Sequence, residues 1–381
     1  MIRKPGLSIE PSVFTEMTAL AIECEAVNLA QGFPDFEGPP EIVEWATAAL
    51  REGHNQYSRS AGMNSLTEAI AESHHRWYGL EWDPAVEVTV FAGATEGIAA
   101  AILATIGPGD EALTFEPYYD SYPALVRLAG GELRTVPLEF PDYAVDLDAL
   151  ERAITPRTRV LIVNTPHNPT GKGFRREELE ARGELCERHD LAVISDEVYE
   201  HITFELPHTP LASIPSLRNR TLTLSSTGKT FSFTGWKIGW GLGNREWSEA
   251  VRATHQFLTF CAATPLQVAM GEALRSVPAE YYDELRTAYR SRRDLLVEGL
   301  REVGFQTATP EGSYFALADY SAWSDRGDRE FAHWLTREVG VAAIPTSAFC
   351  REAPSPPPLL RFAFCKTEES LRAGLGRLAR R

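Results

Sequence analysis

The chain has 381 residues, 44% of them hydrophobic and 24% charged, which is enough apolar material for two buried cores and excludes a disordered protein. Its formal net charge of −16 disfavours general binding to nucleic acid or to anionic membranes. The five cysteines lack metal-ligand spacing and the N-terminus lacks an apolar signal segment, so we expect reduced thiols, no metal site and a cytoplasmic location.

Short apolar runs alternate with helix-like stretches between about residues 85 and 245. The runs at 88–91, 160–163, 192–194 and 222–224 are rich in β-branched residues. This alternation predicts βαβ units and a buried, mostly parallel sheet. Ligands of such sheets gather at the carboxyl ends of the strands, so the polar residues that follow each run are the candidates for chemistry.

The pattern changes after Pro278, where a charged helix is predicted over about 280–302, followed by strands near 314–317 and 359–364. This change indicates a smaller α+β domain. We expect residues 49–278 to form the large domain and 279–381 the small C-terminal domain. Residues 1–48 are expected to form an N-terminal arm and part of the small domain.

Three polar segments follow predicted strands. Residues 164–171 read NTPHNPTG, residues 195–199 read SDEVY, and residues 225–237 read SSTGKTFSFTGWK. Each alone could be an ordinary polar loop, but their joint occurrence, in this order and at these intervals, resembles the fold-type I pyridoxal-phosphate enzymes, and within them the class I/II aminotransferases. The resemblance covers residues 28–366 and implies a mixed, mostly parallel seven-stranded sheet between helices, with a smaller α+β domain.

The resemblance assigns roles around the cofactor, pyridoxal 5′-phosphate. Lys229 corresponds to the lysine that holds the cofactor as a Schiff base and then transfers the α-proton. Asp196 corresponds to the acid that keeps the pyridine nitrogen protonated. Asn168 and Tyr199 correspond to the pair that hydrogen-bonds the phenolic oxygen, and Tyr119, within EPYYD, to the aromatic residue that stacks on the ring.

The phosphate group needs donors and positive charge. The segment GATEG at 93–97 follows a predicted strand and opens a helix, so the N–H groups of Ala94 and Thr95 can meet an anion at the helix N-terminus. By resemblance, Ser226 and Lys237 are further phosphate ligands. Tyr57 resembles a tyrosine that reaches the phosphate from a neighbouring subunit, which implies a homodimer with shared active sites.

Substrate recognition is expected to involve both ends of the chain. Arg361, within LRFAF, corresponds to the arginine that grips the α-carboxylate through a planar fork. Gly32 resembles a glycine whose backbone approaches the same carboxylate, together with Asn168. Their pairing implies that the N-terminal arm folds with the C-terminal domain.

The segments NLAQGFPDF, NQYSRSAG, HQFLTF and IPTSAF are most similar to the kynurenine, glutamine and methionine aminotransferases. No second arginine for a side-chain carboxylate is recognisable. An apolar pocket for a neutral, bulky amino acid is therefore expected, with Phe33, Tyr57 and Phe260 as candidate walls.

Other functions remain open from the sequence. A cysteine-conjugate β-lyase would share the early steps and expel a β-leaving group. A nicotinamide-dependent oxidoreductase is suggested by the glycines at 239–243, but these lack GxGxxG spacing. An aminotransferase-like transcription regulator would need a DNA-binding module before residue 28, where we expect no room for a helix-turn-helix, and the acidic charge argues against it too. The adjacent His74 and His75 are interpreted as exposed helix surface, without a metal-binding role.

Overall fold

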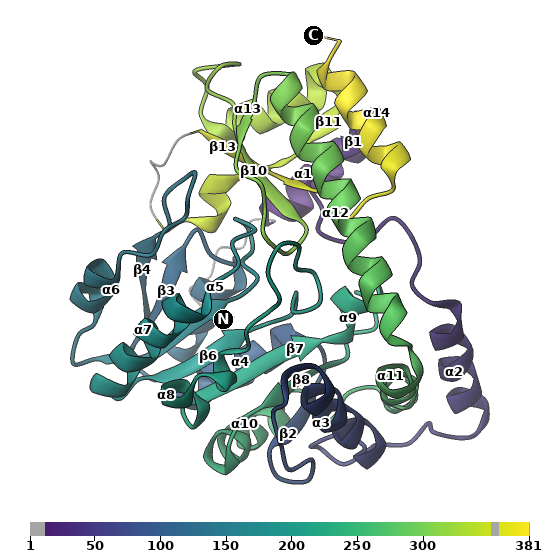
Figure 1. Ribbon diagram of the computed structural model, residues 1–381, viewed down its shortest axis with the longest axis vertical. Helices are drawn as coiled ribbons and strands as arrows, with labels where there is room; N and C mark the ends of the chain where they lie inside the picture. The colour runs from purple at the N-terminus through teal and green to yellow at the C-terminus, as the bar shows by residue number, and fades with distance from the viewer. Residues whose placement is uncertain (1–11, 352–357, 381) are drawn as a thin grey trace, which may run out of the picture.

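The computed structural model describes residues 12–351 and 358–380. Figure 1 shows a larger lobe around a broad sheet and a smaller lobe above it. Helix α12 (Ala279–Glu302) runs from the first lobe to the second, close to the predicted range of 280–302. The domain boundaries proposed from the sequence stay a prediction.

The large sheet has seven strands in the order β2-β8-β7-β6-β5-β3-β4. Strand β8 runs antiparallel to both its neighbours, and the other adjacent pairs are parallel. The predicted mixed, mostly parallel sheet is thus confirmed. The strands are β2 (Val88–Phe91), β3 (Glu111–Glu116), β4 (Glu132–Pro137), β5 (Thr158–Asn164), β6 (Ala192–Asp196), β7 (Thr221–Ser226) and β8 (Gly239–Leu242).

Helices cover both faces of this sheet, as the near-continuous apolar strands require. In β5, Val160 and Ile162 pack into a core with α4, whereas Leu161 and Val163 pack into a second core with α7. The helices of this lobe are α2 (Pro40–Arg51), α3 (Asn64–Tyr78), α4 (Ala94–Thr105), α5 (Ser121–Ala129), α6 (Leu147–Ala153), α7 (Arg176–Arg188), α8 (Pro215–Arg218), α9 (Thr227–Thr230), α10 (Arg245–Leu258) and α11 (Thr264–Ser276).

The smaller lobe contains an antiparallel sheet in the order β12-β13-β10-β9. The N-terminal arm joins this lobe, because β1 pairs in parallel with β11. The elements are α1 (Val13–Glu23), β1 (Val27–Asn28), β9 (Gln306–Thr307), β10 (Phe315–Asp319), α13 (Asp328–Trp334), β11 (Val341–Ala342), β12 (Ile344–Pro345), β13 (Leu359–Ala363) and α14 (Glu368–Leu378).

The interpretation of the histidine pair is half wrong. His75 is exposed, but His74 is only 2% exposed and lies on the buried face of α3, four residues after the buried Ile70. Its ring packs edge-on against Tyr78 at 5.4 Å. Burial lowers the pKa of His74 to about 3, so the imidazole is neutral and packs as part of the buried core.

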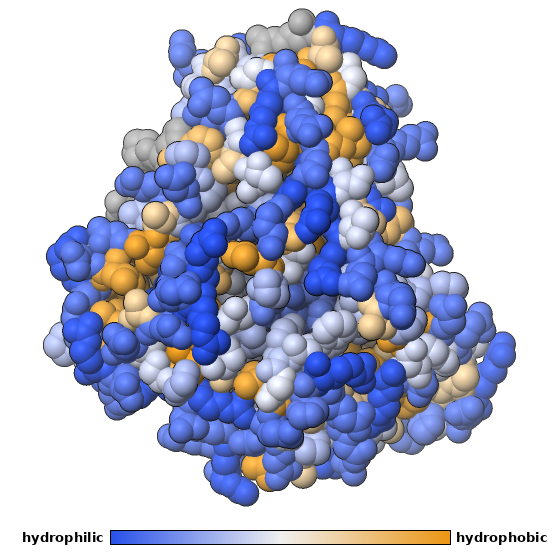
Figure 2. Space-filling model, in the orientation of Figure 1, coloured by the Kyte–Doolittle hydropathy of each residue, from blue (hydrophilic) through white to orange (hydrophobic). Residues whose placement is uncertain are grey.

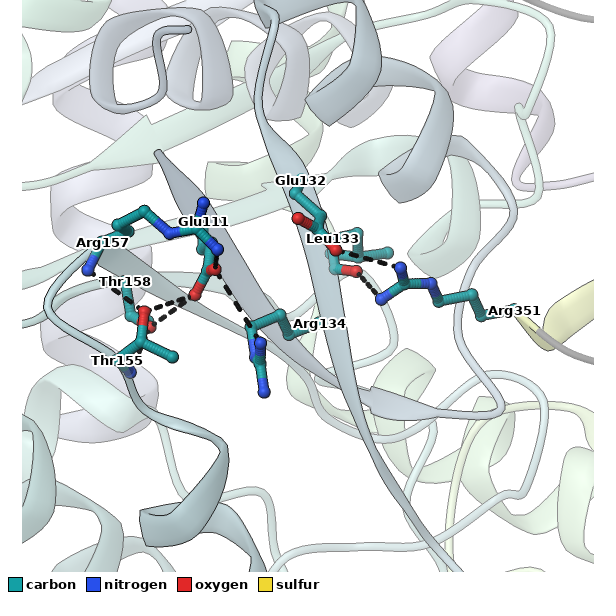
Figure 3. A network of polar contacts seen from close by, with 8 residues as sticks. All are labelled: Glu111, Glu132, Leu133, Arg134, Thr155, Arg157, Thr158 and Arg351. Carbon is teal, nitrogen blue, oxygen red and sulfur yellow. Dashed lines mark hydrogen bonds and ion pairs between the residues drawn. The ribbon is translucent and has the colours of Figure 1, made fainter. Parts of the chain in front are cut away.

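Polar contacts secure the edge of the large sheet (Figure 3). Buried Glu111, at the start of β3, accepts a hydrogen bond from Thr155 at 2.6 Å and pairs with Arg157 and Arg134. Burial alone would raise the pKa of Glu111, but Thr155 and the two guanidinium groups hold it below its usual value. Nearby, Arg351 donates to the carbonyl oxygen of Leu133 at 2.8 Å and so ties the segment after β12 to β4.

Hydrophilic residues dominate the face shown in Figure 2, where apolar residues form separate small groups. Large contiguous apolar patches mark binding surfaces for proteins or membranes, and this face shows none among the described residues. None of the described helices is long and apolar enough to cross a membrane.

Candidate active site

A cavity of about 190 Å³ opens where the carboxyl ends of β5, β6 and β7 meet the start of α4. Strand-end residues converge here because parallel strands present their carboxyl ends at one edge. Nine residues predicted from the sequence line this cavity, namely Ala94, Thr95, Tyr119, Asn168, Asp196, Tyr199, Ser226, Lys229 and Lys237.

Lys229 lies in the short helix α9, directly after β7. Its Nζ donates a hydrogen bond to the hydroxyl of Tyr314 at 2.9 Å. Desolvation by the surrounding protein lowers the pKa of Lys229 to about 8, an effect to which the neighbouring charge of Lys237 contributes and which Asp196 opposes. The amine is therefore closer to neutral, and more nucleophilic at physiological pH, than a lysine on the surface.

Asp196 ends β6 and is almost fully buried. Its Oδ2 accepts a hydrogen bond from Tyr122 at 2.8 Å, whereas Oδ1 is buried and has no hydrogen-bond partner among residues 12–351 and 358–380. Burial raises the pKa of Asp196 to about 6, although the hydrogen bond from Tyr122 acts in the opposite direction. A buried carboxylate oxygen in a cavity wall is satisfied by a cationic N–H donor, which is what a protonated pyridine ring offers.

Another part of the cavity wall, at the start of α4, suits an anion. Helix α4 begins at Ala94, so its first N–H groups lack partners within the helix and the positive end of its dipole faces the cavity wall. Lys237 packs against Gly93, where an added Cβ would lie 2.9 Å from Lys237 Cε. Ser226 precedes α9 and lines the same cavity. This combination of backbone donors, ammonium and hydroxyl fits a phosphate group.

Arg361 joins the small lobe to this site. It lies on β13, is 1% exposed, and donates to Asn168 Oδ1 at 3.0 Å and to the carbonyl oxygen of Ala30 at 3.1 Å. Its Nε is buried and has no hydrogen-bond partner in the described part of the chain. Because Arg361 uses the oxygen of Asn168, the group that Asn168 can offer to a ligand is its amide N–H₂.

The remaining predicted residues lie outside the cavity wall. The carbonyl oxygen of Gly32 accepts a hydrogen bond from Tyr314, and Phe33 is 47% exposed. Tyr57 and Phe260 are 84% and 46% exposed and pack edge-on against each other at 5.4 Å. None of Phe33, Tyr57 and Phe260 is among the described residues that line the cavity.

The structure also adds residues that sequence reasoning missed. Asn164 lines the cavity and accepts a hydrogen bond from the backbone of Asn168 at 2.6 Å. Its position at the end of β5 could have identified it. Tyr122 hydrogen-bonds Asp196 and lies in α5, the first helix after β3, so its position after a strand could also have identified it. Tyr314 hydrogen-bonds Lys229 but precedes β10 of the small sheet, so only the tertiary contacts reveal it.

A family model described as aminotransferase class I and II matches residues 25–378. The probable N-succinyldiaminopimelate aminotransferase of Mycobacterium tuberculosis is 45% identical over 97% of this chain and 95% of its own. The methionine aminotransferase of Escherichia coli is 43% identical over 96% of this chain and 95% of its own. A kynurenine–oxoglutarate transaminase of Mus musculus is 36% identical over 96% of this chain and 87% of its own.

Solved structures agree with these relatives. An Escherichia coli protein whose structure and reactivity identified a methionine aminotransferase function superposes with a TM-score of 0.96 at 42% identity, covering 100% of both chains. The Mycobacterium tuberculosis N-succinyldiaminopimelate aminotransferase gives a TM-score of 0.96 at 45% identity, covering 100% of this chain and 99% of its own. The predicted resemblance to methionine and kynurenine enzymes is confirmed, and the pyridoxal-phosphate-dependent class I and II aminotransferases are the family to which this chain belongs.

Proposed function

We propose that this aminotransferase binds pyridoxal 5′-phosphate at Lys229 and moves the amino group of a neutral, bulky L-amino acid to a 2-oxo acid. The observation that carries this proposal is the unpartnered, buried Oδ1 of Asp196 in the same cavity as the desolvated amine of Lys229. The helix α4 N-terminus, Lys237 and Ser226 fit the phosphate. Tyr119, Asn168 and Tyr199 provide the ring-stacking and hydrogen-bonding groups.

When bound, pyridoxal phosphate supplies a ring that accepts the electron pair left as the substrate α-proton departs. As a neutral amine, Lys229 would accept that proton at Nζ, and as an ammonium it would give the proton back, acting first as base and then as acid. Asp196 would hold the ring nitrogen in its protonated form through Oδ1, while Tyr122 donates a hydrogen bond to Oδ2. The first product leaves as a 2-oxo acid before the acceptor 2-oxo acid binds, which makes the kinetics ping-pong.

Arg361 is proposed to grip the substrate α-carboxylate. The residue is already positioned by Asn168 and Ala30 and keeps an unpartnered Nε. Lysine cannot make a planar two-point contact, so Arg361→Lys is expected to lower kcat/KM for amino acids about 10- to 100-fold. The binding of cofactor should be nearly unchanged, as measured by titration of the visible absorbance band. An equal loss of cofactor affinity would contradict the assignment of Arg361 to substrate.

The substrate preference for a neutral side chain rests on two features. The described residues that line the cavity include no arginine, and the relatives include methionine and kynurenine enzymes. The high identity to an N-succinyldiaminopimelate enzyme makes that compound the second candidate donor. Steady-state kcat/KM values for methionine, kynurenine and N-succinyldiaminopimelate, with one common acceptor, will rank the candidates. A preference of at least about tenfold for N-succinyldiaminopimelate would overturn the neutral-side-chain proposal.

A homodimer would complete the site. Tyr57 and Phe260 form an exposed aromatic pair, and Phe257 nearby in sequence is 85% exposed. Such side chains are typical of protein interfaces. We propose that a second copy of the chain covers this aromatic surface and that Tyr57 reaches the phosphate across the interface. Phe33 and Phe260 are the proposed walls of the substrate pocket.

The proposed transaminase activity is tested by following the visible absorbance spectrum of the enzyme-bound cofactor. Methionine is expected to remove the visible absorbance band, and a 2-oxo acid should restore it, because the amino group is first stored on the enzyme and then returned. A visible absorbance band that does not change with any amino donor would agree with the proposed cofactor binding. It would contradict transamination of these donors.

The cysteine-conjugate β-lyase is the alternative activity. The two reactions diverge after Lys229 removes the α-proton, so one assay with two readouts separates them. Transamination of a cysteine S-conjugate requires a 2-oxo acid acceptor, whereas β-elimination releases pyruvate, ammonia and thiol in equal amounts without an acceptor. We expect acceptor-dependent turnover to dominate.

A further inference from the structure

Tyr314 connects the lysine to the N-terminal arm. This tyrosine precedes β10 and is fully buried, and its hydroxyl lies 2.9 Å from Lys229 Nζ and 2.6 Å from the carbonyl oxygen of Gly32. Three distant parts of the chain therefore meet at one phenol oxygen.

The direction of these hydrogen bonds follows from elementary chemistry. A carbonyl oxygen can only accept, so the single proton of the Tyr314 hydroxyl is used by Gly32. Towards Lys229 the phenol oxygen can then only accept, and Nζ must donate. A neutral amine that donates one N–H to Tyr314 keeps its lone pair for another atom.

We propose that Tyr314 is a positioning residue that binds one N–H of the Lys229 amine and thereby directs the amine lone pair toward the substrate α-carbon. This inference rests on the proposed function of Lys229 as the proton carrier. Lysine has a flexible side chain. A hydrogen bond that fixes its Nζ excludes orientations from which the amine could not transfer the proton. The hydrogen bond lasts through both protonation states, since the ammonium and the neutral amine each have an N–H to donate.

The phenyl ring of Tyr314 has a separate packing role. It contacts Tyr199 edge-on at 5.1 Å, Phe315 at 4.8 Å and Tyr289 in a stacked arrangement at 5.9 Å. Tyr314→Phe keeps this ring and removes only the hydroxyl, which makes it the appropriate variant. Tyr289→Phe is the matched control, because it removes a hydroxyl from the same aromatic cluster in a residue that makes no hydrogen bond to Lys229.

The kinetic test compares the two variants with the cofactor-loaded wild-type enzyme. Tyr314→Phe is expected to lower kcat about 10- to 100-fold and to change KM by less than about threefold, because the lost contact serves proton transfer more than binding. The α-deuterium isotope effect on kcat should increase as proton transfer becomes slower. Tyr289→Phe should retain the wild-type kcat and isotope effect.

The second test measures the Lys229 amine in the full-length, cofactor-free protein. Its reactivity towards an amine-labelling reagent at each pH, read by peptide mass spectrometry, gives its pKa, which desolvation lowers to about 8. The other groups near Nζ are Asp196, Lys237, Arg361, Cys365 and Tyr199. None of them is substituted, but Tyr199 also loses the interaction of its hydroxyl with that of Tyr314. Since an acceptor stabilises the ammonium, Tyr314→Phe should lower this pKa further, by about one unit.

A third variant covers the possibility that Tyr314→Phe does not fold. Site-specific replacement of Tyr314 by difluorotyrosine keeps the hydroxyl but makes its oxygen a weaker acceptor, so smaller changes in kcat and in the lysine pKa are expected in the same directions. Unchanged kcat and unchanged lysine pKa in the folded variants would overturn the role of Tyr314. A wild-type protein that forms no covalent adduct with the cofactor would instead refute the proposed function.

Discussion

Lys229→Ala is expected to reduce transamination by at least about 10⁴-fold, because one substitution removes both the covalent attachment of the cofactor and the group that moves the α-proton. The cavity should still bind pyridoxal phosphate without a covalent bond, since Asp196 and the start of α4 remain in place. The measurement is the single-turnover rate with methionine after saturation with cofactor. Small primary amines in the buffer should restore part of this rate by acting as the missing base.

Lys237→Ala serves as the comparison for this prediction. Both lysines line the cavity, but Lys237 packs against Gly93 beside the phosphate end. Its loss should weaken cofactor binding and leave most of the rate once the cofactor is saturating. If Lys229→Ala retained turnover within about tenfold of the wild type, or if Lys237→Ala were the inactive variant, the assignment of the two lysines would be wrong.

Asp196→Asn is expected to lower kcat about 10²- to 10³-fold while making the cofactor-free protein more stable. The loss arises because a neutral amide cannot hold the ring nitrogen in its protonated form. Asparagine has nearly the same shape, and its oxygen can still accept the hydrogen bond that Tyr122 donates to Asp196. Steady-state kinetics with saturating cofactor measures the loss.

The gain in stability follows from the raised pKa of Asp196. The unfolded chain loses this proton near 3.8 and the folded chain near 6, so the folded protein alone carries a penalty for the buried charge above pH 6. The free energy of unfolding of Asp196→Asn should exceed that of the wild type by about 2–3 kcal/mol at pH 7. The difference should shrink as pH falls from 6 towards 4, because the folded Asp196 carboxyl becomes protonated while the asparagine amide is neutral throughout.

Denaturant unfolding of both cofactor-free proteins at pH 7.5 and pH 4.5 tests this reasoning. Tyr122→Phe is the matched variant, because it keeps the charge and removes the hydrogen bond, which should raise the pKa of Asp196 and lower stability at pH 7.5. If Asp196→Asn were less stable than the wild type at both pH values, Asp196 would have a structural role that the burial of its charge does not explain.

Local sequence patterns predicted the large sheet because each buried strand is a short apolar run followed by a polar turn. The strand at 88–91 and the helix from about 280 to 302 have nearly the predicted limits, since their neighbours break the pattern sharply. His74 was misread although the same logic applied. It lies four residues after Ile70 on one face of α3, and helical spacing places it in the core.

The sequence predicted those cavity residues that follow strands of the large sheet. Asp196, Asn168 and Lys229 follow parallel strands, so the topology brings them together. Tyr314 bonds Gly32, a residue 282 positions earlier in the chain, and no local pattern records such a contact. Neither strand ends nor local patterns could predict the surroundings of Tyr57 and Phe260, because their proposed partner is a second copy of the chain.

The most direct test of the central claim is to load the wild-type protein with pyridoxal phosphate, reduce it with borohydride and locate the modified residue by peptide mass spectrometry. Reduction makes the bond between a lysine amine and the cofactor permanent, so the label marks the residue that held it. We predict the phosphopyridoxyl mass on Lys229 alone, at one per chain. A label on Lys237 or on another lysine, or no label at all, would contradict the account of this active site.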